Sequence, residues 1–130
     1  MNIFKTKDIG DIGEEYVAKF LRKNKYKILE RNYRKNYGEV DIIASNKEYI
    51  IFVEVKTRHI ESMTQPVDAV DKQKQRKIIK TAAAYLLEND TDKYSRFDVC
   101  EVYIDSKTLK VININYIENA FIQEGGYAPY

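Results

Sequence analysis

The sequence predicts an α/β fold with about five strands and two helices. Apolar residues recur at helical spacing over residues 8–24 and 67–89. Five shorter runs are rich in β-branched and aromatic residues, as strands are. One of them, Ile50–Lys56, is apolar on both faces, which indicates an interior strand. A length of 130 residues suits one domain with its own core. We expect that domain over residues 1–122 and a loose tail over 123–130.

Composition indicates the cellular compartment of the protein. The single cysteine, Cys100, excludes a disulfide framework and suits a reducing compartment. Residues 1–8 lack the apolar segment of a signal peptide, and no run approaches the 18 or so apolar residues that span a membrane. We therefore expect a cytoplasmic protein without a membrane partner.

The first helix carries two adjacent acids in its opening turns. Asp8 or Asp11 is available to cap its start. On a helical wheel Glu14 falls beside Leu21, at the edge of the apolar stripe, whereas Glu15 points further towards solvent. Glu14 is therefore the better candidate for an inward acid. The alternative is that both glutamates only favour the helix N-terminus electrostatically.

Strands are predicted over residues 26–33, 38–45 and 48–57, and the last two form an antiparallel hairpin. If the turn centres on residues 47 and 48, Asp41 lies directly across from Glu54. If it centres one residue earlier, Asp41 faces Phe52 and Glu54 is its diagonal neighbour, at roughly 7–8 Å instead of about 5 Å between Cβ atoms. Either register leaves Asp41, Glu54 and Lys56 on one face, because side chains alternate with period two.

The second half of the chain supplies the other helix and two more strands. After a loop with His59, Met63 and Pro66, the helix over 67–89 has Lys74 inside its apolar stripe. Either the lysine stem covers apolar surface, or its ammonium reaches a site under the helix. Strands are expected over 96–104 and 109–116, followed by a short turn or helix over 117–121.

Charge is distributed unevenly although the net charge is only +2. Residues 19–35 hold eight basic residues against one acid, a local charge of +7. A second basic run covers 72–80, with no acid in it. Each run alone is often just a solvated face. Two such runs around an acidic centre favour a polyanion as partner, because the basic flanks hold phosphates while the acids hold a cation.

The acidic centre suits metal-dependent hydrolysis of a phosphodiester. Charged groups on an interior strand cost several kcal/mol, roughly, unless they are paired or hold a metal. Asp41 and Glu54, with the Val55 carbonyl, offer hard oxygen ligands for Mg²⁺, or for Mn²⁺ in its place. Lys56 is placed to act on the attacking water or on the transition state, and Glu14 to complete the metal shell. The lone cysteine and the lone histidine support no nucleophilic triad.

Several separated motifs occur in one order along the chain. They are Gly13-Glu14, Arg31-Asn32-Tyr33-Arg34, Gly38-Glu39-Val40-Asp41, Phe52-Val53-Glu54-Val55-Lys56, Lys74-Gln75-Arg76 and Arg96-Phe97-Asp98-Val99. From about residue 9 to 121 the chain resembles the YraN-like family of predicted endonucleases. That family resembles the PD-(D/E)XK nucleases and the archaeal Holliday junction resolvases.

The resemblance implies a restriction-endonuclease-like mixed sheet flanked by helices. It also implies that Asp41, Glu54 and Lys56 form the core motif and that Glu14 is an auxiliary acid. The expected activity is Mg²⁺-dependent endonucleolytic cleavage of DNA, with branched or distorted duplex as substrate. The residues expected near phosphate are Arg31, Arg34, Arg58, Lys74 and Gln75.

Two other functions fit the same residues. One is a non-catalytic nucleic-acid-binding module that has kept the fold and the basic surface. The other is purely structural, with Lys56 and Arg58 neutralising Glu54 and Asp41. A symmetric junction as substrate would favour a two-fold homodimer that carries two sites.

Overall fold

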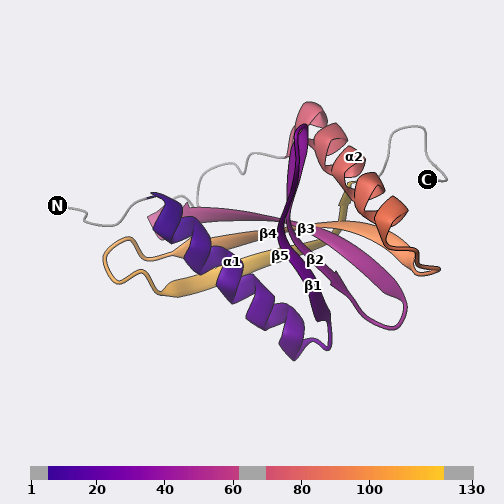
Figure 1. Ribbon diagram of the computed structural model, residues 1–130. Coiled ribbons are helices and arrows are strands. Elements are labelled where there is room, and N and C mark those ends of the chain that lie inside the picture. Colours follow the sequence, from indigo (N-terminus) through magenta and orange to yellow (C-terminus); the bar gives the residue numbers. More distant parts are fainter. Residues whose placement is uncertain (1–5, 62–69, 122–130) are drawn as a thin grey trace.

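The computed structural model describes residues 6–61 and 70–121 of the chain (Figure 1). Two helices and five strands follow one another in the order α1 (Thr6–Lys23), β1 (Lys27–Lys35), β2 (Gly38–Ser45), β3 (Tyr49–His59), α2 (Lys72–Glu88), β4 (Tyr94–Ile104) and β5 (Val111–Phe121). This α/β architecture is the one that the sequence predicts. The predicted tail over 123–130 and the loop positions Met63 and Pro66 lie outside the described residues.

The strands form one mixed sheet in the order β1-β2-β3-β4-β5. β3 pairs with β4 in parallel, and the other neighbouring strands are antiparallel. A parallel pair needs a crossover connection, and here α2 lies in it between β3 and β4. The predicted interior strand is β3, which has a strand on each side. Within the described residues, no helix is both long and apolar enough to cross a membrane.

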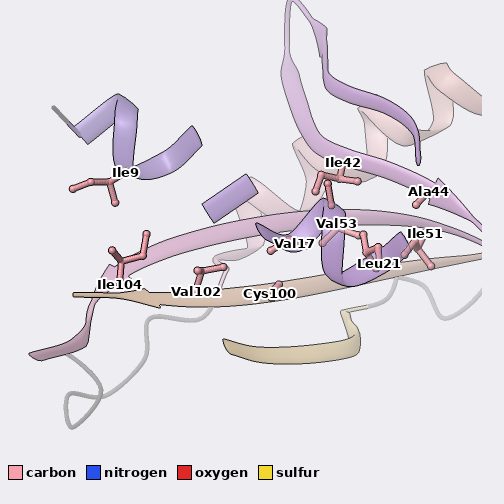
Figure 2. Close-up of a cluster of buried hydrophobic side chains, with 11 residues drawn as sticks. Ile9, Val17, Leu21, Ile42, Ala44, Ile51, Val53, Cys100, Val102 and Ile104 are labelled. Carbon is pink, nitrogen blue, oxygen red and sulfur yellow. The ribbon is translucent and has the colours of Figure 1, made fainter. Parts of the chain in front are cut away.

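Helix α1 covers one face of the sheet. Its buried residues Val17, Ala18 and Leu21 pack against side chains of β2, β3 and β4. Figure 2 shows this cluster, with Ile42 and Val53 near Leu21 of the helix and Val102 further along the sheet. Residues 42 and 44 on β2, and 51 and 53 on β3, share this cluster because alternate side chains of a strand point to one face.

Helix α2 covers the other face. Its buried residues Ile78, Ala82 and Tyr85 pack with Ile43 of β2 and Phe52 of β3. Asp41 and Glu54 lie two positions along from these two strand residues, so period two places both acids on the α2 face. The hairpin of β1 and β2 rises beside α2 (Figure 1).

Gly38 permits the close contact between this hairpin and α2. A Cβ atom there would lie 2.6 Å from Thr81 Oγ1 and 2.9 Å from the Lys77 carbonyl oxygen. Because one of these neighbours is helix backbone, a larger residue at position 38 would force the strand away from the helix. The start of β2 is therefore placed against α2 by the absence of a side chain.

Most predicted elements differ from the structure by one or two residues at their ends, and two differ by more. The second helix begins at Lys72 and not at residue 67: Val70 and Asp71 are not helical, and the Asp71 side chain accepts a hydrogen bond from the Lys74 N–H as N-cap. Residues 117–121 continue strand β5 instead of forming a turn or helix. The register shift between Phe97 and Val99 of β4 absorbs the irregularity at this end of the pair.

Replacing Gly13 by alanine is expected to lower the free energy of unfolding by about 1–3 kcal/mol, because the new Cβ would collide with Thr57 Oγ1 of β3. Gly10→Ala on the same helix is the matched control. Its Cβ meets nothing within 4 Å, so that variant should gain about 0.4–1 kcal/mol. Urea unfolding measures both. The Thr57→Ala change should rescue Gly13→Ala, and an equal gain for both glycine variants would contradict the close packing.

Candidate functional site

Asp41 of β2 and Glu54 of β3 meet on the α2 face of the sheet. Ile42 pairs with Val53 in the β2–β3 ladder, and the same register carried one residue further sets Asp41 opposite Glu54. This is the first of the two predicted registers, with a two-residue turn at residues 47 and 48 that the bond from the Asn46 N–H to the Tyr49 carbonyl closes. The Asp41 carboxylate accepts a hydrogen bond of 2.8 Å from the Val55 N–H.

Glu54 strongly perturbs the titration of the Asp41 carboxyl group. Glu54 is only 6 % exposed. Burial, followed by the hydrogen bond and the charge of Glu54, raises the pKa of Asp41 to about 9, although the bond from the Val55 N–H opposes the shift. Two adjacent carboxylates in a poorly solvated place do not both ionise without a cation beside them. The pair therefore holds a proton at neutral pH or binds positive charge.

Lys74 of α2 supplies positive charge to this pair. Its Nζ lies 2.7 Å from Glu54 Oε2, and that hydrogen bond raises the pKa of Lys74. The N-cap bond from the Lys74 N–H to Asp71 sets where the first turn of the helix begins. The inward lysine that the helical wheel picks out thus reaches a carboxylate under the helix, which is the second of its two predicted interpretations.

A cleft of about 430 Å³ opens over Asp41 and Glu54, between β2, β3 and the start of α2. Its charged lining residues are four acids and two lysines: Glu39, Asp41, Glu54, Asp71, Lys74 and Lys77. Two lysines against four acids leave a formal charge of −2, so the cleft attracts cations.

Glu14 comes close to the cleft from α1. With the Asn32 amide turned so that its nitrogen faces the acids, that nitrogen lies 3.1 Å from Glu14 Oε1 and 3.2 Å from Glu39 Oε1. Burial raises the pKa of Glu14, and Arg31 and the Asn32 bond oppose the rise. The charge of Glu14 in turn contributes to the raised pKa of Asp41. Asn32 has a φ of 54°, a conformation that asparagine tolerates better than most residues.

The arginines and the glutamine predicted near phosphate all have partners within the protein. Arg31 pairs with Glu15 at 3.2 Å, and Arg34 with Glu39 at 2.9 Å. The Gln75 amide donates to the Val70 carbonyl oxygen at 2.7 Å, which ties the start of α2 to the preceding residue. Arg58 faces Glu101 at 3.8 Å. Lys56 lies on the same strand face as Glu54 and is partly buried.

The carboxylates of the cleft fit a divalent cation only in part. Among residues 6–61 and 70–121, no three histidine, cysteine, aspartate or glutamate side chains form a group that could hold a metal ion. Two hard carboxylates, Asp41 and Glu54, stand together in a cleft of net negative charge. That donor set suits Mg²⁺, which is often bound by one or two carboxylates, several waters and substrate phosphate. The Val55 amide is engaged with Asp41 through its N–H.

The raised pKa of Asp41 has a consequence for stability. Between about pH 4 and pH 9 the folded protein holds a proton at Asp41 that the unfolded chain has lost, so the free energy of unfolding should fall as pH rises through this range. Asp41→Asn should flatten that fall, because an amide binds no proton. Urea unfolding in EDTA from pH 5 to pH 9 measures the two slopes, and equal slopes would contradict the assignment to Asp41.

The sequence interpretation missed the cleft residues Glu39, Asp71 and Lys77, and Asn32 beside the cleft. Period two does place Glu39 on the face of Asp41, so its role was open to prediction. Asp71 and Lys77 reach the cleft because α2 begins at Lys72, a boundary that the apolar pattern misplaced. The bridge made by Asn32 depends on the approach of α1 to β1 and β2, for which no local pattern exists.

The fold and the cleft define an α/β protein with a mixed five-stranded sheet and a pair of carboxyl groups, one half-buried and one buried, under a lysine-bearing helix. Residues 13–102 match the model of a family described as "Uncharacterised protein family UPF0102". The chain belongs to this family, the YraN-like group that its motifs resemble.

Relatives of this family cover nearly the whole chain. A UPF0102 protein of Caldanaerobacter subterraneus subsp. tengcongensis is 44% identical over 116 residues, which span 88% of this chain and 95% of the relative. One of Clostridium botulinum is 43% identical over 121 residues, with 88% and 94% covered. One of Alkaliphilus metalliredigens is 41% identical over 117 residues, with 89% and 99% covered.

Proposed function

We propose that the protein is a Mg²⁺-dependent endonuclease that hydrolyses DNA phosphodiesters, with branched or distorted duplex as its substrate. The observation that carries the proposal is the pair of half-buried Asp41 and buried Glu54, side by side in a cleft of net negative charge. A pair of acids with only a structural role would destabilise the fold here, because burial and Glu54 disfavour ionisation of Asp41.

Each side chain has a defined part in this proposal. Asp41 and Glu54 hold the cation, and Glu14 acts on it from α1 at longer range. When bound, the metal supplies an activated water and stabilises charge on the scissile phosphate. Lys56, on the same strand face, orients the water or neutralises the transition state. Mn²⁺ has the same ligand preference and is expected to replace Mg²⁺.

The basic residues around the cleft support DNA as the substrate. Lys74 and Lys77 lie on the cleft wall formed by α2. Lys80, one turn further along the helix, stacks over the Tyr37 ring at 4.3 Å from its centroid, at the tip of the β1–β2 hairpin. Helix and hairpin tip together form a basic rim beside an acidic floor. Phosphate contacts to such a rim fix the register of a duplex without reading its sequence.

The test is cleavage of four DNA forms, namely a four-way junction, a flap, a single strand and a linear duplex, in Mg²⁺ or Mn²⁺. The control carries Asp41→Asn and Glu54→Gln together. We expect the wild-type protein to cut the junction or the flap fastest and the control to cut none of the four. No cleavage above that of the control on any substrate would overturn the enzyme assignment.

The second candidate is a non-catalytic nucleic-acid-binding module. The contact between Lys74 and Glu54 favours it, because an ammonium group already neutralises one of the two acids. Such a module should bind DNA with a steep salt dependence that survives the loss of Asp41 or Glu54. A Mg²⁺ titration by calorimetry separates the two functions, since an enzyme site should bind the ion with an affinity that depends on both acids.

A further inference from the structure

Glu101 is a buried acid for which the proposed chemistry has no use. It lies on β4, and it is 1% exposed although it is charged. Its Cα pairs with Lys56 on the parallel neighbour β3 and with Asn115 on β5. Paired residues of neighbouring strands point to one face, so Glu101 stands beside Lys56 on the face that carries Asp41 and Glu54.

The bonding of the Glu101 carboxylate is incomplete. Oε1 accepts a 2.9 Å hydrogen bond from Asn115 Nδ2, and the Tyr103 hydroxyl also interacts with this carboxylate. Oε2 lies 3.8 Å from Arg58 Nε, and neither of these two buried atoms has a hydrogen-bond partner among the described residues. Burying a carboxylate costs several kcal/mol, roughly, and a long, poorly bonded ion pair offsets little of that cost.

Arg58 is the residue that faces this carboxylate. It follows Glu54 and Lys56 on the same face of β3, with about 6.6 Å between alternate residues of a strand. A guanidinium group is planar and carries five N–H donors. When its Nε edge faces a fixed carboxylate, its two terminal nitrogens have a defined direction and present a fork that suits a phosphate.

We propose that Glu101 is a positioning residue that fixes Arg58 against a DNA phosphate next to the one that is cut. This inference rests on the proposed function, because it needs DNA on this face of the sheet. The Glu101 carboxylate would favour DNA binding only through Arg58. By its charge alone, a carboxylate close to the DNA would repel the phosphates.

The direction in which one substitution changes DNA affinity therefore distinguishes a positioning role from a simple effect of charge. Glu101→Gln keeps the shape of the side chain and an oxygen for Asn115, but it removes the charge that faces Arg58. If Glu101 positions Arg58, binding to a four-way junction should weaken, by about eightfold at 0.1 M salt, the contribution of one phosphate contact. The slope of log K against log salt should become shallower by about one contact.

The experiment is a double-mutant cycle measured by fluorescence anisotropy in EDTA, so that no DNA is cut. Arg58→Gln should weaken binding as much as Glu101→Gln does, and the double variant should be no worse than either one. Glu30→Gln, an exposed acid of β1, is the matched control and should bind at least as well as wild type. Equal or tighter binding by Glu101→Gln, or effects that multiply in the double variant, would overturn the positioning role.

Two further measurements distinguish failure of the positioning role from misfolding of the variant and from failure of the proposed function. If Glu101→Gln fails to fold, Arg58→Lys takes its place: a lysine cannot face the carboxylate and a phosphate with one planar fork, so wild-type binding by that variant would overturn the proposal. If the wild-type protein binds none of the DNA forms and cuts none, the proposed function fails and takes this role with it. Wild-type binding with an indifferent Glu101→Gln variant rejects the positioning role alone.

Discussion

The Glu54→Gln variant is expected to lose cleavage by about 10³-fold or more while it stays folded. A bound metal contributes several kcal/mol to transition-state stabilisation, and about 4 kcal/mol corresponds to a factor of 10³. Glutamine keeps the volume of the buried side chain and removes the charge that a cation needs. The measurement is the single-turnover rate on the preferred DNA substrate in saturating Mg²⁺.

The free energy of unfolding distinguishes a metal-binding role of Asp41 and Glu54 from a purely structural one. In the proposed site the two acids oppose each other, so replacing one of them without metal should leave the free energy of unfolding unchanged or raise it above neutral pH. Lys74 loses its partner, but its side chain is 56% exposed and such pairs contribute little. If Glu54 served only as an ion-pair partner, Glu54→Gln would destabilise the protein with and without Mg²⁺.

Thermal unfolding with and without Mg²⁺ measures this difference. Wild-type protein should gain stability with Mg²⁺ because the ion binds only the folded state, and Glu54→Gln should lose most of the gain. Glu48→Gln, in the exposed turn of the same hairpin, should retain both the gain and the cleavage rate. Equal Mg²⁺ stabilisation of the wild type and Glu54→Gln would remove Glu54 from the metal site.

The hairpin at the centre of the fold was predictable because two independent local signals agree on it. Period-two alternation sets the faces, and the polar turn after Ser45 sets the register, so strand β2 has its predicted limits, residues 38–45. The inward position of Lys74 also followed from local spacing, since a helical wheel needs no tertiary contact. That Glu54 is the partner of Lys74 could not be predicted, because the distance between α2 and β3 depends on how the whole sheet packs.

The strand conformation of residues 117–121 and the burial of Glu101 could not be predicted, because both depend on residues far away in the chain. Residues 117–121 carry a left-handed residue, Asn119, which suggests a turn when seen alone. Its N–H donates to Asp98 of β4, and this bond keeps the segment in the sheet. Glu101 lies inside the run from Phe97 to Ile104, where two acidic residues, Asp98 and Glu101, stand among apolar ones. Burial of such a group is decided by neighbours on other strands.

Asp98→Ala is expected to give the largest loss of stability, about 3–5 kcal/mol, which is the usual effect of removing one partner of a buried ion pair. Asp98 is fully buried and Arg96 is nearly so. The Arg96 guanidinium donates to both carboxylate oxygens at 2.9–3.2 Å. The Tyr116 hydroxyl donates at 2.6 Å and the Asn119 N–H at 2.9 Å. One side chain thus joins β4 to two points of β5.

Urea unfolding of three variants tests this role of Asp98. Asp92→Ala, an exposed acid before β4, is the matched control and should change stability by less than about 0.5 kcal/mol. Arg96→Met combined with Asp98→Ala should be more stable than Asp98→Ala alone, because the unpaired guanidinium is then gone. A loss below about 1 kcal/mol for Asp98→Ala, or no recovery in the double variant, would show that the buried pair is not what holds the end of β5 to the sheet.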